Sequence, residues 1–134
     1  MDWKLELIVL PVTDVDRAKA FYSDQLGFTL DVDHSAGEDF RIVQLTPPGS
    51  ACSVTLMRRP DSAGSVQGLH LVVTDIEAAH AELSARGAPV SEVFHFVNGA
   101  QAAGPDPARG DYNSFVSFAD PDGNGWLVQE AHRA

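Results

Sequence analysis

The chain has 134 residues, of which 44% are hydrophobic, and this is enough for the core of one compact domain. The chain contains 9 Lys and Arg residues and 19 Asp and Glu residues, so its formal net charge is -10. This charge argues against nucleic acid and anionic membranes as partners. The single cysteine, Cys52, rules out a disulfide within the chain, and without a signal peptide or about 18 consecutive apolar residues we expect a cytoplasmic protein.

The first half of the chain predicts a β-α-β-β-β unit. Asp14 is a residue type that caps a helix N-terminus, and apolar residues then recur at helical spacing from Val15 to Leu26. Gly27 is suited to end this helix. The polar segment 59–67 is the expected joint to the second half. We place the strands at residues 5–12, 28–33, 40–46 and 52–58.

The second half predicts the same order of elements with one longer loop. Asp75 is expected to cap a helix whose buried stripe is Ile76, Ala79 and Leu83. Residues 98–111 are rich in Gly, Ala and Pro and show no apolar periodicity, so this segment is either a lid or a disordered loop. We place the strands at residues 68–74, 90–97, 112–118 and 126–130.

One stretch of sequence occurs twice. Residues 10–20 read LPVTDVDRAKA and residues 71–81 read LVVTDIEAAHA, so that 6 of 11 positions are identical at an offset of 61 residues. Both copies run from a predicted strand into a capped helix, and the offset is near half the length of the chain. We interpret the repeat as the internal duplication of one supersecondary unit.

Alternation along the first strand of each half assigns its two faces, because successive side chains of a strand point to opposite sides. The face covered by the helix would carry Ile8, Leu10 and Val12 in the first copy and Leu69, Leu71 and Val73 in the second. The opposite face is also apolar, with Leu7 and Val9 in the first copy, so it needs a cover of its own. We therefore expect the sheet to curl and to enclose a cleft on this side.

Several motifs in this order resemble the vicinal oxygen chelate superfamily, the group of glyoxalase I, bleomycin-resistance proteins and extradiol dioxygenases. They are the repeated strand-Val-x-Asp-helix phrase, Phe21-Tyr22, Leu26-Gly27-Phe28 and the turn Asp120-Pro121-Asp122-Gly123. The resemblance implies an α+β fold in which two tandem βαβββ modules form a curved mixed sheet around a cleft. It also implies a single domain over residues 1–134, with modules at 1–60 and 66–134.

Metal-dependent members of that superfamily hold a divalent ion with side chains from the first and last strands of each module. Carried over residue by residue, these positions are Leu7 and Gly68 on the first strands, and Leu127 and Thr55 on the last. None is a good ligand, because metal sites need two or three carboxylate, imidazole or thiolate groups. We therefore expect neither a metal nor a cofactor.

The residues expected to face the cleft form a mostly apolar set with a few polar atoms, which is typical of a small-molecule pocket. The alternative is that they pack against one another and leave no cavity. His70 would hydrogen-bond a ligand or act as an acid/base catalyst near neutral pH, and the alternative is a core histidine satisfied by a neighbour. The set consists of Leu7, Val9, Thr55, Met57, Gly68, His70, Leu127 and Gln129.

The remaining histidines and aromatic residues are expected outside the cleft. His95 is expected to be exposed, with a place at the cleft mouth as the alternative. Phe115 and Trp126 are expected in the core on the helix side. We expect His34, His80 and His132 to face solvent.

Three functions remain in competition. The first is a binding protein that takes up an organic small molecule without metal, similar to resistance proteins that sequester drugs. The second is a metal-dependent lyase, isomerase or dioxygenase with ligands at unusual positions, and the third is a metal-free enzyme that uses His70. The sequence leaves open whether the chain acts as a monomer or as a homodimer.

Overall fold

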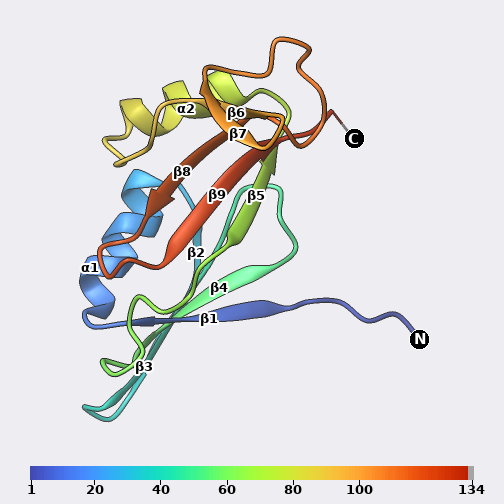
Figure 1. Cartoon of the computed structure of the whole chain (residues 1–134). Coiled ribbons are helices and arrows are strands. Elements are labelled where there is room, and N and C mark those ends of the chain that lie inside the picture. The colour runs from blue at the N-terminus through green and yellow to red at the C-terminus, as the bar shows by residue number, and fades with distance from the viewer. Residues whose placement is uncertain (133–134) are drawn as a thin grey trace. The chain divides into compact units, whose positions relative to one another are not determined.

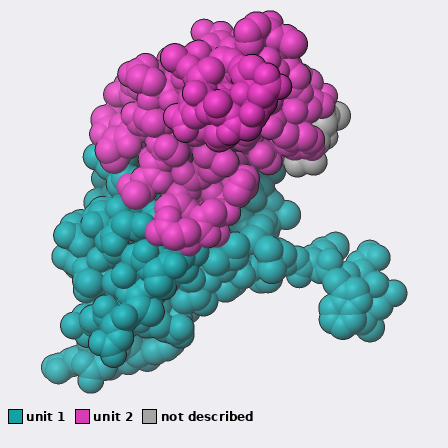
Figure 2. Space-filling view, in the orientation of Figure 1, with its two compact units in different colours: residues 1–66, 120–124 teal, residues 67–119, 125–134 magenta. Residues whose placement is uncertain are grey.

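The computed structural model describes residues 1–132 and divides the chain into two compact units (Figures 1 and 2). Unit 1 contains residues 1–66 and 120–124, and unit 2 contains residues 67–119 and those from 125 onward. The units are therefore not continuous in sequence, because a short turn from the second half of the chain belongs to unit 1. That the whole chain is one domain stays a prediction.

Unit 1 is a four-stranded sheet with its helix on one face. The strand order is β1-β4-β3-β2, with β1 parallel to β4 and the other neighbours antiparallel. The helix covers the face of Leu10 and Val12, both fully buried, as the alternation predicted. The elements are β1 (Leu7–Val12), α1 (Val15–Ala20), the π-helical turn η1 (Phe21–Gln25), β2 (Thr29–Ala36), β3 (Phe40–Thr46) and β4 (Ser53–Arg58).

The predicted single helix up to Leu26 is wrong in its second half. Asp14 caps α1 as expected, and its Oδ1 accepts a hydrogen bond from the Arg17 N–H at 3.1 Å. After Ala20 the chain widens into η1, where the Leu26 N–H bonds to the carbonyl of Phe21. The wider turn allows the adjacent residues Phe21 and Tyr22 both to be buried, which a regular helix facing one sheet does not favour.

The turn at residues 120–124 is fixed inside unit 1 by buried polar contacts. The Tyr22 hydroxyl donates to Asp120 Oδ2 at 2.8 Å, and Asn124 Nδ2 donates to the same oxygen at 2.8 Å and to the Pro11 carbonyl at 3.0 Å. Asp120 Oδ1 accepts the N–H groups of Asp122 and Asn124. The aspartate that begins the Asp-Pro-Asp-Gly motif therefore has a structural role.

Unit 2 is a five-stranded sheet in the order β5-β9-β8-β6-β7, with β5 parallel to β9 and helix α2 packed against β8 and β9. The Asp75 cap is confirmed, because its carboxylate accepts the N–H groups of Glu77 and Ala78. Of the predicted stripe only Ile76 is fully buried, and Ala79 and Leu83 are half-buried. The elements are β5 (Leu69–Val73), α2 (Ile76–Ala85), β6 (Phe94–Val97), β7 (Ala100–Ala103), β8 (Phe115–Ala119) and β9 (Gly125–Glu130).

The segment 98–111, expected to be a lid or disordered, contains a strand. β6 and β7 form a hairpin in which Val97 pairs with Ala100, and the two turn residues Asn98 and Gly99 both have positive φ, 52° and 81°. Asn-Gly is the dipeptide that such two-residue hairpin turns favour. β6 begins at Phe94 rather than at residue 90, because Ser91 instead bonds to Ser117 through its N–H and its side chain.

The α+β class and the sequence of strand, helix and strands in each half are confirmed, with one strand more in the second half than predicted. The last two strands, β8 and β9, lie where they were predicted, although β8 starts at Phe115 and not at residue 112. None of the described helices is long and apolar enough to cross a membrane.

Candidate functional site

The face of the unit 2 sheet that points away from α2 carries a row of side chains from three strands. Val116 and Val128 pair in register and are buried on the α2 side. Because side chains alternate, Ser117 and Leu127 point to the other side, and His70 on β5 is the register partner of Leu127. The row therefore presents an imidazole, an isobutyl group and a hydroxyl side by side.

An open hollow of about 570 Å³ lies along this row. Three of the residues predicted to line a cleft, Gly68, His70 and Leu127, border it together. The loop residues Pro89 and Val90 close one side. Further residues at its border are Gln67, Ser91, Ser117, Phe118, Ala119, Gly125 and Trp126.

His70 is exposed, and one of its ring nitrogens is already bonded. Nδ1 lies 2.6 Å from the Gly68 carbonyl oxygen, and Gly68 itself has a φ of 77°, which favours glycine at this position. A carbonyl oxygen only accepts, so Nδ1 must carry the proton. In the neutral imidazole Nε2 is then the acceptor, and it is the ring atom left for a ligand.

Three phenylalanines extend the same face, a group that the sequence interpretation missed. Phe115 pairs with Gln129 on one side and with Phe94 on the other. The rings of Phe94 and Phe115 stack at 5.5 Å, and Phe96 meets Phe115 edge to face at 5.7 Å. The prediction that Phe115 lies on the helix side is wrong, because its register partner Gln129 shares the face of Leu127.

The rings are partly open to solvent. Phe96 is 43% exposed and Phe94 is half-buried, whereas Phe115 beneath them is 8% exposed. Trp126, by contrast, pairs with Phe118 and stacks on it at 5.8 Å, on the side of Val128 as predicted. We call Phe94, Phe96 and Phe115 the aromatic patch.

The predicted cleft residues of unit 1 share the face of its sheet opposite the helix. Val9 pairs with Thr55, which pairs with Gln44, and Leu7 and Met57 lie on the same face by alternation. This face is more polar than predicted. Gln44, Ser53, Thr46 and Asp31 form a chain of side-chain hydrogen bonds along it.

Thr55 stands out on the unit 1 face because it is 5% exposed. Its Oγ1 has no hydrogen-bond partner among the described residues. A buried hydroxyl without a partner is unfavourable by roughly 1–3 kcal/mol, so this atom is available to a donor or acceptor that reaches it.

Met57 borders a second hollow of about 750 Å³ in unit 1, and its border is mainly charged, including Asp16, Glu38 and Arg41. Arg41 pairs with Asp16 at 2.6 Å and with Asp33 at 2.9 Å. Hydrogen bonds from Arg41 and then from Lys19 hold the pKa of Asp33 well below its usual range. These charges satisfy one another, and we assign them to the stability of the sheet edge.

The side chains present do not fit a resident metal ion. Leu7, Gly68 and Leu127 offer no donor atom, and the Thr55 hydroxyl is a single neutral oxygen. Across residues 1–132 no group of three or more His, Cys, Asp or Glu side chains is placed to hold an ion.

The remaining histidines differ partly from prediction. His95 was expected to be exposed, yet it is 6% exposed, and its Nδ1 lies 2.7 Å from the Gly104 carbonyl, which it binds across the β6–β7 hairpin. His34 is exposed on β2, as expected. His80 is half-buried and therefore less exposed than predicted. His132 is exposed but bound to Asp111.

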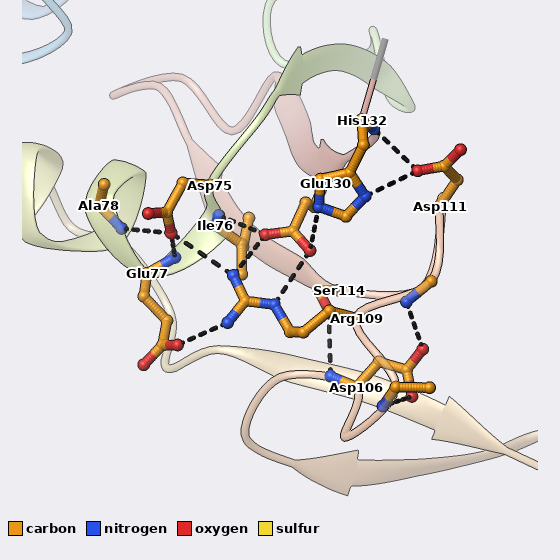
Figure 3. A network of polar contacts seen from close by, with 12 residues as sticks. Asp75, Ile76, Glu77, Ala78, Asp106, Arg109, Asp111, Ser114, Glu130 and His132 are labelled. Carbon is orange, nitrogen blue, oxygen red and sulfur yellow. Dashed lines mark hydrogen bonds and ion pairs between the residues drawn. The ribbon is translucent and has the colours of Figure 1, made fainter.

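A buried carboxylate at the start of α2 organises the segment after β7 (Figure 3). Glu130 has a fully buried side chain and accepts the Ile76 N–H at 2.9 Å. Arg109 donates to both of its oxygens and also pairs with Glu77 at 2.7 Å. Hydrogen bonds from Arg109 outweigh burial and lower the pKa of Glu130. Residues 104–113 are therefore tied to the sheet by ion pairs, and we assign this network to structure.

Residues 4–128 match the family described as Glyoxalase/Bleomycin resistance protein/Dioxygenase superfamily. The chain belongs to this superfamily. The resemblance predicted from the motifs is thereby confirmed, and so is the fold, which the superfamily's solved structures share.

Two solved structures of proteins from Streptomyces sp. CB03234 are similar to this chain over nearly the whole length of each. TnmS3, an antibiotic-binding protein, is 30% identical with a TM-score of 0.74, covering 96% of both chains. A glyoxalase/bleomycin resistance protein is 31% identical with a TM-score of 0.70, covering 95% of this chain and all of its own. An uncharacterized protein of Bacillus subtilis (strain 168), YetH, is 24% identical over 92% of this chain and 94% of its own.

Proposed function

We propose that this chain binds an organic small molecule and holds it chemically unchanged, as a sequestering resistance protein does. The observation that carries the proposal is the half-open aromatic patch, which shares one sheet face with the hollow at His70. Exposed aromatic rings beside a few fixed polar atoms are typical of small-molecule sites. The 30% identity to an antibiotic-binding protein supports the same function.

The chemistry of this face favours a flat ligand with a hydrogen-bond donor. An aromatic ring system would stack on or meet the edge of Phe96, which is 43% exposed and held by two neighbouring rings. When the His70 imidazole is neutral, its Nε2 accepts a hydrogen bond, because Nδ1 is directed at the Gly68 carbonyl, and it then suits a hydroxyl or amide N–H of the ligand. Gln129, half-buried between Val72 and Phe115, offers both a donor and an acceptor.

Two enzymatic functions compete with this proposal. In a metal-free enzyme His70 would exchange a proton with the substrate through Nε2. The substrate would lie against His70 as the bound ligand does, but the reaction would form a product. In a metal-dependent enzyme an ion would have to be held by groups other than the superfamily positions, since Leu7, Gly68 and Leu127 have no donor atoms. Product formation would distinguish the metal-free enzyme from a binding protein. Metal content of the purified protein would distinguish the metal-dependent enzyme.

The experiment begins with a thermal-shift screen of aromatic compounds that carry hydroxyl or amide groups. A ligand present at 100 times its dissociation constant stabilises the fold by about 2.7 kcal/mol, which is easily measured. Affinity is then compared by calorimetry for His70→Phe and for His34→Phe, an exposed histidine of unit 1. Loss of one neutral hydrogen bond should weaken binding roughly 3- to 10-fold in the His70 variant only.

Mass spectrometry of the recovered ligand completes the test, together with elemental analysis of the purified protein. The proposal predicts an unchanged ligand and no stoichiometric transition metal. Turnover that disappears in His70→Phe would replace it by the metal-free enzyme, and tightly held metal with activity would replace it by the metal enzyme. A cytoplasmic location belongs to the same proposal and is tested by cell fractionation.

A further inference from the structure

The hairpin of β6 and β7 lies at one edge of the unit 2 sheet and carries two rings of the aromatic patch, Phe94 and Phe96. Within residues 1–132 its backbone register with β8 consists of one pair, in which Phe94 lies opposite Phe115. If the same antiparallel register continued by two residues, Asn113 would lie opposite Phe96. Because β8 begins at Phe115, this position of the ladder lies outside the strand.

The side-chain amide of Asn113 takes the place of the absent backbone pair. Its Oδ1 accepts the Phe96 N–H at 3.0 Å, and its Nδ2 donates to the Phe96 carbonyl at 3.1 Å. A two-residue turn joins Val97 to its partner Ala100, and bonded pairs alternate along an antiparallel ladder, so the polar groups of Phe96 point away from β7. A primary amide satisfies both groups because it carries an acceptor and a donor in one plane, as a peptide group does.

The backbone on both sides of Asn113 is bonded to β9 instead of β6. The Tyr112 N–H donates to the Glu130 carbonyl at 2.7 Å, and the Glu130 N–H donates to the Ser114 carbonyl at 3.0 Å. The side chain of Asn113, rather than its backbone, therefore reaches across to β6. At Phe96 the two backbones are consequently further apart, by about the length of this side chain, than a direct ladder pair would place them.

The amide of Asn113 is itself held in place. Asn113 is half-buried and forms a side-chain hydrogen bond with Asp106. The Asp106 carboxylate accepts the N–H groups of Ala108 and Gly110, at 3.2 and 3.0 Å. Because these contacts restrict the side chain of Asn113, its two bonds to Phe96 fix the strand in one place.

We propose that Asn113 is a positioning residue of the ligand site, which sets the place of Phe96 through its backbone. The inference rests on the proposed function. Where the backbones pair directly, the rings of Phe94 and Phe115 stack at an interplanar angle of 29°. Where Asn113 separates the backbones, the ring of Phe96 meets Phe115 at 68° and is 43% exposed. The spacing set by Asn113 thus accompanies the tilted, open ring on which an aromatic ligand would pack.

The test compares the native chain with Asn113→Ala and with Gln101→Ala as the matched control. Gln101 is the register partner of Phe96 on β7, so each change removes an amide beside Phe96, but the Asn113 amide is the one bonded to its backbone. NMR of the free proteins gives the first reading. In Asn113→Ala the Phe96 amide hydrogen should exchange roughly tenfold faster or more, and the Phe96 ring signals should shift.

The amide hydrogen of His95 separates loss of position from loss of stability. His95 is paired with Ala102 on β7, so its exchange should stay near that of the native chain in both variants. Gln101→Ala should leave the exchange of Phe96 near native as well. Exchange at Phe96 and ring signals that are unchanged in Asn113→Ala would overturn the inference, and so would faster exchange of Phe96 and His95 alike.

The second reading is the affinity for 2-naphthol, a flat aromatic compound with one hydroxyl, and for the aromatic compounds found by thermal shift. NMR titration is made well below the melting temperature of each variant. We expect Asn113→Ala to weaken binding roughly 3- to 10-fold, the range of one aromatic contact, and Gln101→Ala to change it little. Equal affinity of Asn113→Ala and the native chain overturns the inference and leaves the proposed function standing. A native chain that binds none of these compounds overturns both.

Discussion

The guanidinium of Arg109 donates to both carboxylate oxygens of Glu130, from Nη2 at 2.6 Å and from Nε at 3.0 Å. The carboxylate is fully buried, whereas the guanidinium is partly exposed. Arg109 adopts a φ of 50°, which is unfavourable for a residue with a side chain, so the surrounding contacts must hold it there. This pair fixes the segment after β7 to the start of α2 and to the end of β9.

Replacement of Arg109 by Met should destabilise the fold strongly. Among the described residues the change leaves the buried Glu130 carboxylate with the Ile76 N–H and with the exposed His132, whose Nε2 lies 3.4 Å from Oε2. Loss of the main cationic partner of a buried charge is among the largest single effects known. We expect the melting temperature to fall by about 10 °C or more. Water that enters beside the partly exposed position would make this fall smaller, because it solvates the Glu130 carboxylate. Arg58→Met, at an exposed arginine of β4, is the matched control and should shift the melting temperature little.

The same pair makes stability depend on pH in a definite direction. Hydrogen bonds from Arg109 lower the pKa of Glu130 in the folded chain below the 4.5 of the unfolded one. As the pH falls, the unfolded chain therefore takes up the proton first, so this stabilisation is complete above pH 4.5 and is lost as the pH falls through the folded pKa.

Comparison of the native chain with Glu130→Gln isolates the contribution of Glu130 to this pH dependence. The other carboxyl groups whose pKa values are lowered are present in both proteins. Urea unfolding from about pH 7 down to about pH 3 should show a variant that is less stable at neutral pH, with a difference that narrows in acid. A difference that is constant with pH would mean that the charge of Glu130 contributes nothing.

Tyr22→Phe tests the contact that holds the 120–124 turn in unit 1. The change removes the hydroxyl that donates to Asp120 across 98 positions of sequence, and within residues 1–132 Asp120 Oδ2 keeps Asn124 as its one donor. We expect a loss of about 1–2 kcal/mol in the free energy of unfolding, measured by urea denaturation. Tyr112→Phe, at a tyrosine that is 50% exposed, should lose clearly less. Equal losses would show that the buried contact contributes no more than an exposed hydroxyl.

The features predicted correctly from the sequence are those that depend on residues close to one another in the chain. Asp14 and Asp75 cap their helices because a side-chain carboxylate suits the free N–H groups at a helix start. The helix-facing sides of the first strands follow from alternation alone, as with the buried Leu10. These inferences need no knowledge of which strands become neighbours.

The features missed depend on pairing between distant residues. Phe115 shares the face of Gln129 because of the register between β8 and β9, and this register places one of the three rings in the aromatic patch. His95 is buried because β7 returns beside it. One local signal does predict this strand: Asn98-Gly99 is a dipeptide that favours a two-residue hairpin turn, and it lies between β6 and β7 in the segment expected to be a loop.

Phe96→Ala, compared with Phe40→Ala, asks whether the aromatic patch is the ligand surface. The two phenylalanines are nearly equally exposed, at 43% and 45%, but only Phe96 belongs to the patch. With any aromatic ligand found by thermal shift, loss of the ring at Phe96 should raise the dissociation constant by about tenfold, since an aromatic pair contributes about 0.5–1.5 kcal/mol beyond the area it buries. Calorimetry below the melting temperature of each variant gives the constants. An equal effect of both substitutions would place the ligand elsewhere on the chain, while an effect at Phe96 alone, with the ligand recovered unchanged, would establish unit 2 as its binding surface.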